Sequence, residues 1–175
     1  MKKLVITESE KRRIRSLYEQ VGGESTYNLL GNTINITLEK VIDKYGDFES
    51  FLQEVPMECE NLLVTTPNGI FQNPYFNVES IDIPESIGKL TNLKSLMLEG
   101  FVKSLPESIG NLKDLNYLSI PYNKELKSLP ESIASMPHLT VLNLKYGNPD
   151  INIPPTLQEK LIPDGDGLYY LENNN

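Results

Sequence analysis

The residues able to do chemistry are few and widely separated. The 175 residues include one histidine, His138, and one cysteine, Cys59. One histidine cannot form a histidine-based metal cluster, and a lone cysteine cannot form an internal disulfide, which is typical of a reducing compartment. Glu58 and Glu60 flank Cys59, and adjacent negative charge disfavours a reactive thiolate. Because the sequence also has no phosphate-binding glycine loop and no nucleophile elbow, we predict a non-enzyme without metal or cofactor.

The one acidic motif with regular spacing is Asp164-Gly165-Asp166-Gly167. A calcium loop would need a further oxygen ligand two residues on and a later glutamate, but Leu168 and Asn175 stand there. The alternating glycines favour a tight turn instead, followed by a closing strand over residues 168–171.

Internal repetition is the strongest pattern in the chain. The motif Pro-Glu-Ser-Ile begins at three prolines, and a degenerate fourth copy follows, with spacings of 22, 24 and 24 residues: Pro84, Pro106, Pro130 and Pro154. Each of the first three copies continues into Leu-x-x-Leu-x-Leu/Ile, beginning at Leu93, Leu115 and Leu139. Leucines that alternate in this way predict a short strand with one buried face, and Ile87 with Leu90 predicts one helical or 3-10 turn facing the core.

The period and the pattern resemble the leucine-rich-repeat family over residues 80–155, in particular the subclass of Ras-pathway scaffolds. The resemblance implies an α/β solenoid with a parallel sheet, a non-catalytic role in protein binding, and capping segments at both ends. It also implies an asparagine after each strand that bonds to the neighbouring turn. Only Asn123 fills that position, because Phe101 and Gly147 replace it in the other copies.

The fold implied by the repeats offers a concave face, formed by the residues between the leucines. The partner-binding residues that we predict there are Met97, Glu99, Tyr117, Ser119, Tyr122, Asn143, Lys145 and Tyr146. Tyrosine combines a large contact area with a polar tip and suits the centre of an interface. Tyr169 or Tyr170 is expected to extend the row. The alternative is that these tyrosines only shield neighbouring leucines.

The N-terminal segment predicts an amphipathic basic helix within residues 1–22. Thr7 and Glu10 form a capping box, and the candidate docking residues follow: Arg12, Arg13, Ile14, Leu17 and Tyr18. Residues 4–18 also resemble a leader found on tailed-bacteriophage proteins, which implies a phage-encoded protein. The alternative is a plain capped helix with a solvated face.

Residues 23–79 predict a helical cap and a transition into the repeats, which then occupy residues 80–175. Thr37 is expected to cap a helix that ends near Gly46, and Phe48 begins another that Pro56 stops. Leu62-Leu63-Val64 is interpreted as part of the transition, with a diverged extra repeat as the alternative.

Composition limits the class of partner. The formal net charge of −8 argues against binding to nucleic acid or to an anionic membrane. We expect a cytoplasmic adaptor that binds a protein or peptide. The alternative is a structural or decoration component of an assembly such as a phage virion, attached through the N-terminal helix. Either protein could form a homo-oligomer that covers an open end of the repeats.

Overall fold

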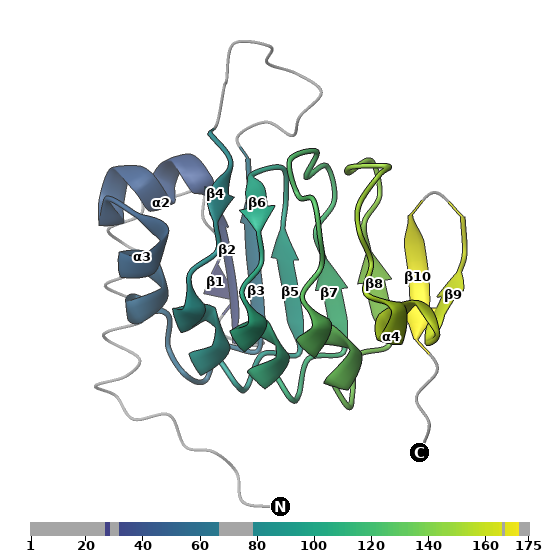
Figure 1. The fold of residues 1–175 in the computed structure, drawn as a ribbon. Coiled ribbons are helices and arrows are strands. Elements are labelled where there is room, and N and C mark those ends of the chain that lie inside the picture. Colours follow the sequence, from purple (N-terminus) through teal and green to yellow (C-terminus); the bar gives the residue numbers. More distant parts are fainter. Residues whose placement is uncertain (1–26, 29–31, 67–78, 166, 172–175) are drawn as a thin grey trace, which may run out of the picture.

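The structure is a computed structural model that describes residues 27–28, 32–66, 79–165 and 167–171 (Figure 1). The predicted docking residues within 12–18 lie outside these ranges. The fold is mixed α/β, with one eight-stranded sheet and short helices, as expected. The strands, in spatial order, are β1 (Tyr27–Asn28), β2 (Thr33–Thr37), β3 (Asn61–Thr65), β5 (Ser95–Leu98), β7 (Tyr117–Ser119), β8 (Val141–Asn143), β10 (Leu168–Leu171) and β9 (Leu161–Pro163).

The sheet is largely parallel. Strands β2, β3, β5, β7 and β8 pair parallel in one continuous register, and β1, β10 and β9 add antiparallel pairs at the two ends. The helices are α2 (Leu38–Tyr45), α3 (Phe48–Glu54), α4 (Pro155–Gln158) and the 3-10 helices η1 (Glu85–Lys89), η2 (Glu107–Asn111) and η3 (Glu131–Ser135). A small parallel sheet joins β4 (Ile81–Asp82) to β6 (Val102–Ser104).

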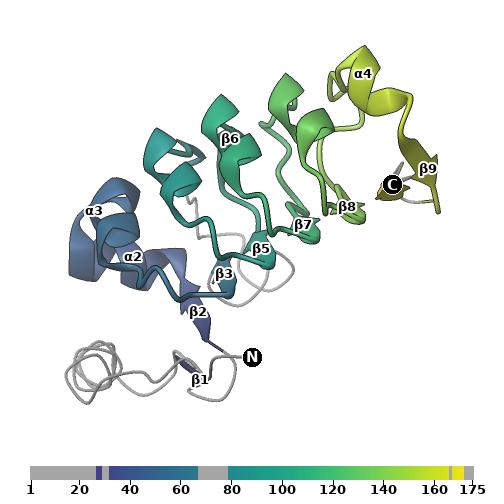
Figure 2. The same ribbon diagram turned by 90° about the horizontal axis from the view of Figure 1, so that it is seen from below.

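We call residues 84–105, 106–129 and 130–153 the three units, because each runs from a 3-10 helix into a strand of the large sheet. The 3-10 helices lie along one side of the row of strands, which we call the helical side (Figure 2). Parallel strands require such a return path on one face. The leucines and isoleucines of the motif are buried between strands and 3-10 helices in one continuous core.

The prolines of the repeated motif stand directly before the 3-10 helices. Pro84, Pro106 and Pro130 precede the first helical residue with extended backbone (ψ 146° to 158°) and are not themselves in the turn. Their carbonyl oxygens accept the bond that closes each 3-10 turn, for example from the Ile87 N–H at 3.1 Å. Proline suits this position because the helix needs its carbonyl and not its missing N–H.

Glycine permits the close spacing of the 3-10 helices. A Cβ on Gly88 would lie 2.5 Å from the Ser108 carbonyl oxygen, and a Cβ on Gly110 would lie 2.5 Å from the Ser132 Cβ. Real Cβ atoms do not come so close to another heavy atom. The Gly of the repeated motif is therefore needed wherever another unit packs against it, and Ala134 replaces it in the third unit.

Carboxylates tie neighbouring units together on the helical side. Glu107 accepts hydrogen bonds from the backbone N–H groups of Glu131 (3.2 Å) and Ser132 (3.0 Å) at the start of η3. Glu131 in turn accepts from the Thr156 hydroxyl at 2.6 Å. The first N–H groups of a helix have no partner within it, so a carboxylate from the preceding unit satisfies them.

Helices α2 and α3 form as the sequence predicts. Thr37 caps α2 by accepting from the Lys40 N–H at 3.4 Å, and Asp47 caps α3 by accepting from the Ser50 N–H at 2.6 Å. Phe48 of α3 lies against the buried Phe101, with ring centroids 5.7 Å apart. These helices therefore close the apolar end of the core that the first unit leaves open.

The prediction of a mainly helical N-terminal region misses three strands of the large sheet, β1, β2 and β3. β2 and β3 continue the sheet in register with β5, so the same sheet contains strands from before and after residue 80. Residues 61–65 form a strand that pairs parallel with β5, as the strands of the three units pair with one another. β2 was missed because TINIT is short, half polar and paired with a strand distant in the sequence.

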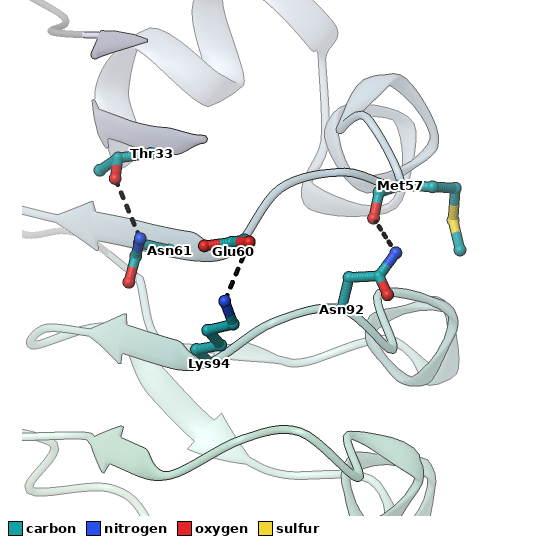
Figure 3. Close-up of polar contacts among 6 residues, drawn as sticks. All are labelled: Thr33, Met57, Glu60, Asn61, Asn92 and Lys94. Atoms are coloured by element: carbon teal, nitrogen blue, oxygen red, sulfur yellow. Dashed lines mark hydrogen bonds and ion pairs between the residues drawn. The ribbon is translucent and has the colours of Figure 1, made fainter. Parts of the chain in front are cut away.

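Polar contacts fix the junction between this region and the first unit (Figure 3). Lys94 and Glu60 form an ion pair at 3.0 Å, and the Asn92 side chain donates to the Met57 carbonyl at 2.7 Å. The Asn61 side chain donates to the Thr33 hydroxyl at 3.1 Å and so links β3 to β2. The contacts join residues far apart in the sequence across three adjacent strands.

The C-terminal end closes as a hairpin. β9 and β10 pair antiparallel, and Leu168 to Tyr170 of β10 pair with β8. Gly165 and Gly167 have positive φ of 80°, which the tight turn requires. The predicted closing strand over residues 168–171 is confirmed, and β9 is a strand that the sequence did not reveal.

Candidate functional site

The sheet presents a second face away from the helical side, which we call the strand face (Figure 2). Side chains alternate along a strand, so the residues between the buried leucines point to this face. In register across the sheet these are Leu63, Met97, Ser119, Asn143 and Leu168 in one row, and Asn61, Ser95, Tyr117, Val141 and Tyr170 in the next. This face holds four of the eight predicted binding residues.

The predicted tyrosines do not form one cluster. Tyr117 begins β7 and stands in register with Val141, which itself pairs with Tyr170, so these three make an apolar group on the strand face. Tyr122 and Tyr146 instead follow the carboxyl ends of β7 and β8. Tyr170, and not Tyr169, extends the row, because Tyr169 is paired with the buried Leu142 and packs on the core.

Tyr122 and Tyr146 stack on each other at the carboxyl edge of the sheet. Their ring centroids are 4.8 Å apart and their planes differ by 18°. Tyr146 is 59% exposed, so its ring is accessible to a partner. Together with Glu99, which follows β5 at the same edge, we call these residues the tyrosine rim.

Both rim tyrosines have left-handed backbone conformations. The φ angles are 61° at Tyr122 and 58° at Tyr146, and the corresponding residue after β5 is Gly100 with φ 83°. A non-glycine residue in this region costs roughly 1–2 kcal/mol. Glycine would adopt this turn without strain, so at these two positions the stacking of the rings offsets a backbone cost that glycine would avoid. Backbone strain of this kind is frequent at binding sites.

Hydrogen bonds hold the turn beneath the rim. The Asn143 side chain donates to the Ser119 hydroxyl at 3.0 Å and accepts from the Lys145 N–H at 3.0 Å. The Lys145 carbonyl accepts from the Tyr122 N–H at 2.9 Å. Ser119 is fully buried, so it cannot contact a partner directly as predicted. It instead orients Asn143 at the base of the site.

Asn123 anchors the turn from the other side. Its carbonyl oxygen accepts from the Val102 N–H at 2.6 Å, and its amide donates to the Leu98 and Pro121 carbonyls at 2.9 and 3.1 Å. The expected bond from this asparagine to the neighbouring turn is confirmed. Because Asn123 directly follows Tyr122 and is buried, it fixes the position from which that ring projects.

Glu99 brings negative charge to the rim. Its half-buried position raises the pKa of its carboxyl group, because burial penalises the charged form. The pKa of Tyr122 is also raised, first by loss of solvent, then by Tyr146 and by Glu99. Within the described ranges no ion pair or hydrogen bond reaches the Glu99 side chain. Met97, two residues before Glu99, lies on the strand face opposite Ser119, and Lys145 directly precedes Tyr146.

The residues with reactive side chains lie elsewhere. Cys59 is buried, its thiol donates to the Asn61 carbonyl at 3.3 Å, and burial raises its pKa to about 12. Burial contributes more to this raised pKa than the negative charge of the adjacent Glu60 does. His138 is exposed. Among the described residues, no group of three or more histidine, cysteine or acidic side chains is arranged to hold a metal ion.

Comparison with known proteins gives no guide to the site. No family model matches the chain, and no curated protein is significantly similar to it. Across the described ranges, the helices lack the length and apolar character needed to span a bilayer. The interpretation of the strand face and the tyrosine rim therefore rests on their geometry.

Proposed function

We propose that this protein is a leucine-rich-repeat solenoid whose strand face and tyrosine rim bind a protein or an extended peptide without catalysis. The three sequence copies, each a 3-10 helix followed by a parallel strand, support the solenoid. One observation carries the binding role, namely the strained and stacked pair of Tyr122 and Tyr146. Left-handed non-glycine residues cluster at sites where their side chains serve a ligand or a partner.

The apolar group on the strand face gives the partner a second point of attachment. Tyr170 is 43% exposed and Ile162, paired with it on β9, is 45% exposed. Together with Val141 and Tyr117 they form an apolar patch that continues across β7, β8 and the C-terminal hairpin. Aromatic anchors of this kind contribute most of the energy at protein interfaces. An extended peptide could contact this patch and the rim together.

The test is selection of binding peptides from a displayed random library with the full-length protein. We expect enriched peptides that bind the wild type and lose at least about tenfold in affinity with Y117A/Y122G/Y146G. Glycine is used at positions 122 and 146 because it keeps the left-handed turn. The matched control is N111A/S135A/Q158A, three exposed residues on the helical side, which should bind as the wild type does.

Two results would count against this function. The first is a library selection with no enriched peptide, and the second is enriched peptides that bind the tyrosine variant normally. Deletion of residues 1–22 distinguishes the adaptor role from the alternative, a structural component attached through the N-terminal segment. If that deletion abolishes an association that the tyrosine variant retains, the assembly role through the N-terminal segment would replace the adaptor role.

A further inference from the structure

The tyrosine rim combines three features suited to a planar cation. The two rings form one stacked platform with centroids 4.8 Å apart, and the ring of Tyr146 is exposed. The turn that carries them is fixed by the Asn143 and Asn123 hydrogen bonds. A platform that is already ordered loses little conformational entropy when a ligand binds.

Glu99 provides the complementary charge. Its carboxylate is half-buried, and in the described part of the chain it has no counter-ion. A partly desolvated carboxylate without a counter-ion raises the free energy of the folded state, as the raised pKa of this group reflects. A cation from a partner would relieve that cost, so the unpaired charge favours a basic ligand over an acidic or neutral one.

We propose that the tyrosine rim is the binding site for an arginine side chain of the partner, with the guanidinium stacked on the exposed ring of Tyr146, which itself stacks on Tyr122, and paired with Glu99. The proposal rests on the proposed peptide-binding function and names the residue that the peptide must present. The net charge of −8 would draw a basic segment toward the protein before it reaches the rim.

Arginine fits better than lysine for geometric reasons. Its guanidinium is planar, so it can stack on an aromatic ring while its N–H groups bind a carboxylate in pairs. A lysine ammonium is compact and more strongly hydrated, and it gains less from a flat platform. Lys145 does not fill this role within the described structure, because it makes no ion pair with Glu99.

The test is an NMR titration of the full-length, nitrogen-15-labelled protein with N-acetyl-arginine methylamide. The citrulline analogue, of the same shape without the charge, and the lysine analogue serve as comparison ligands. We expect saturable shifts at the amides of Gly100, Tyr122 and Tyr146, with arginine binding about three- to tenfold more tightly than citrulline. E99Q should remove the preference for arginine, and Y146G should remove binding of both.

Y146F is the matched control, because it keeps the ring and removes only the hydroxyl, so it should retain the binding. The proposal is overturned if arginine and citrulline bind equally, if lysine binds more tightly than arginine, or if E99Q leaves the preference unchanged. It is also overturned if saturable shifts occur away from the rim or do not occur. Circular dichroism of each variant shows whether it is folded.

The peptide selection distinguishes failure of this inference from failure of the proposed function. Enriched peptides that lack arginine and bind E99Q normally would overturn the arginine site and leave peptide binding intact. Saturable arginine binding at the rim without any enriched peptide would support the site and contradict the proposed peptide partner.

Discussion

On the helical side, successive units place the same residue types at the same positions, whereas at the tyrosine rim the types change from unit to unit. Gly88 and Gly110 both permit close packing, and the carboxylate of Glu107 satisfies the N–H groups of the next helix. At the rim, the left-handed position after the strand is Gly100 in the first unit and tyrosine, Tyr122 and Tyr146, in the next two. Packing between units explains the constant residue types on the helical side. The varying residue types at the tyrosine rim are available to determine which partner binds.

The largest effect should come from Asn123, which is buried and fixes the turn next to Tyr122. Its replacement in N123A leaves the buried Val102 N–H and Leu98 carbonyl without partners, at a cost of about 3 kcal/mol of unfolding free energy. Urea denaturation measures the loss. N148A is the control, because Asn148 makes fewer bonds in a more exposed turn and should cost about 1 kcal/mol. Equal costs would show that burial of Asn123 is unimportant.

The helical side should tolerate no added methyl group. G110A would force its Cβ against the Ser132 Cβ, and we expect a loss of about 1–3 kcal/mol in urea denaturation. Part of that loss should be recovered in G110A/S132G, which removes the opposing side-chain atoms.

Gly88 provides the contrast, because the nearest atom to its added Cβ is the backbone oxygen of Ser108. Removal of the Ser108 side chain should therefore rescue G88A less than S132G rescues G110A. Equal rescue at both glycines would contradict this account of the spacing.

The rim should tolerate a change that the helical side does not. Y146G removes the strain of the left-handed turn, about 1 kcal/mol, and loses ring stacking of similar size. We expect unfolding free energy within about 1 kcal/mol of the wild type, together with loss of peptide binding. A loss of several kcal/mol would instead show that the tyrosine only shields neighbouring leucines.

The smallest effects should come from two glutamates, Glu107 and Glu99, whose charges change the stability of the fold in opposite directions. Hydrogen bonds from Ser132 lower the pKa of Glu107, so this group stabilises the fold above its unfolded pKa. E107Q should therefore cost less than about 0.5 kcal/mol at neutral pH, because the exposed group is screened by solvent. The difference should vanish as pH falls through the lowered pKa of the folded state.

Burial raises the pKa of Glu99, so its charge destabilises the fold above that pKa. E99Q should slightly increase stability at neutral pH. That gain should disappear as pH falls from the raised folded pKa to the unfolded value near 4.5. Thermal unfolding of both variants from neutral to acidic pH measures these changes in stability. A change in the same direction for E107Q and E99Q at neutral pH would contradict the prediction.

The sequence predicts most of what the helical side requires. The spacing of Ile87 and Leu90 indicates the 3-10 turn, and the alternating leucines indicate the strands, because both patterns follow from burial on one face. Strands β2 and β9 were missed since their stability depends on partners, not on local pattern. One sequence feature could have predicted the left-handed backbone of the tyrosines. Tyr122 and Tyr146 align with Gly100 in the repeated motif, and glycine at that position indicates a positive φ.

The stacking of the rings and the burial of Ser119 could not be predicted. Both depend on the register between strands, which brings Asn143 beside Ser119 and the turn of Tyr146 beside that of Tyr122. The partner-binding role of Met97, Glu99 and Lys145 remains a prediction from their place on the face or at the rim.

Ala134 has a consequence for how long such a molecule can become. It stands where Gly88 and Gly110 stand in the earlier units, and its carbonyl accepts from the Lys160 ammonium of the C-terminal segment at 2.7 Å. Another unit placed after it at the same spacing would meet its methyl group. Duplication of a unit during evolution, or its insertion by design, would therefore cost less stability ahead of residue 134 than behind it. One methyl group thereby favours one direction for lengthening the protein.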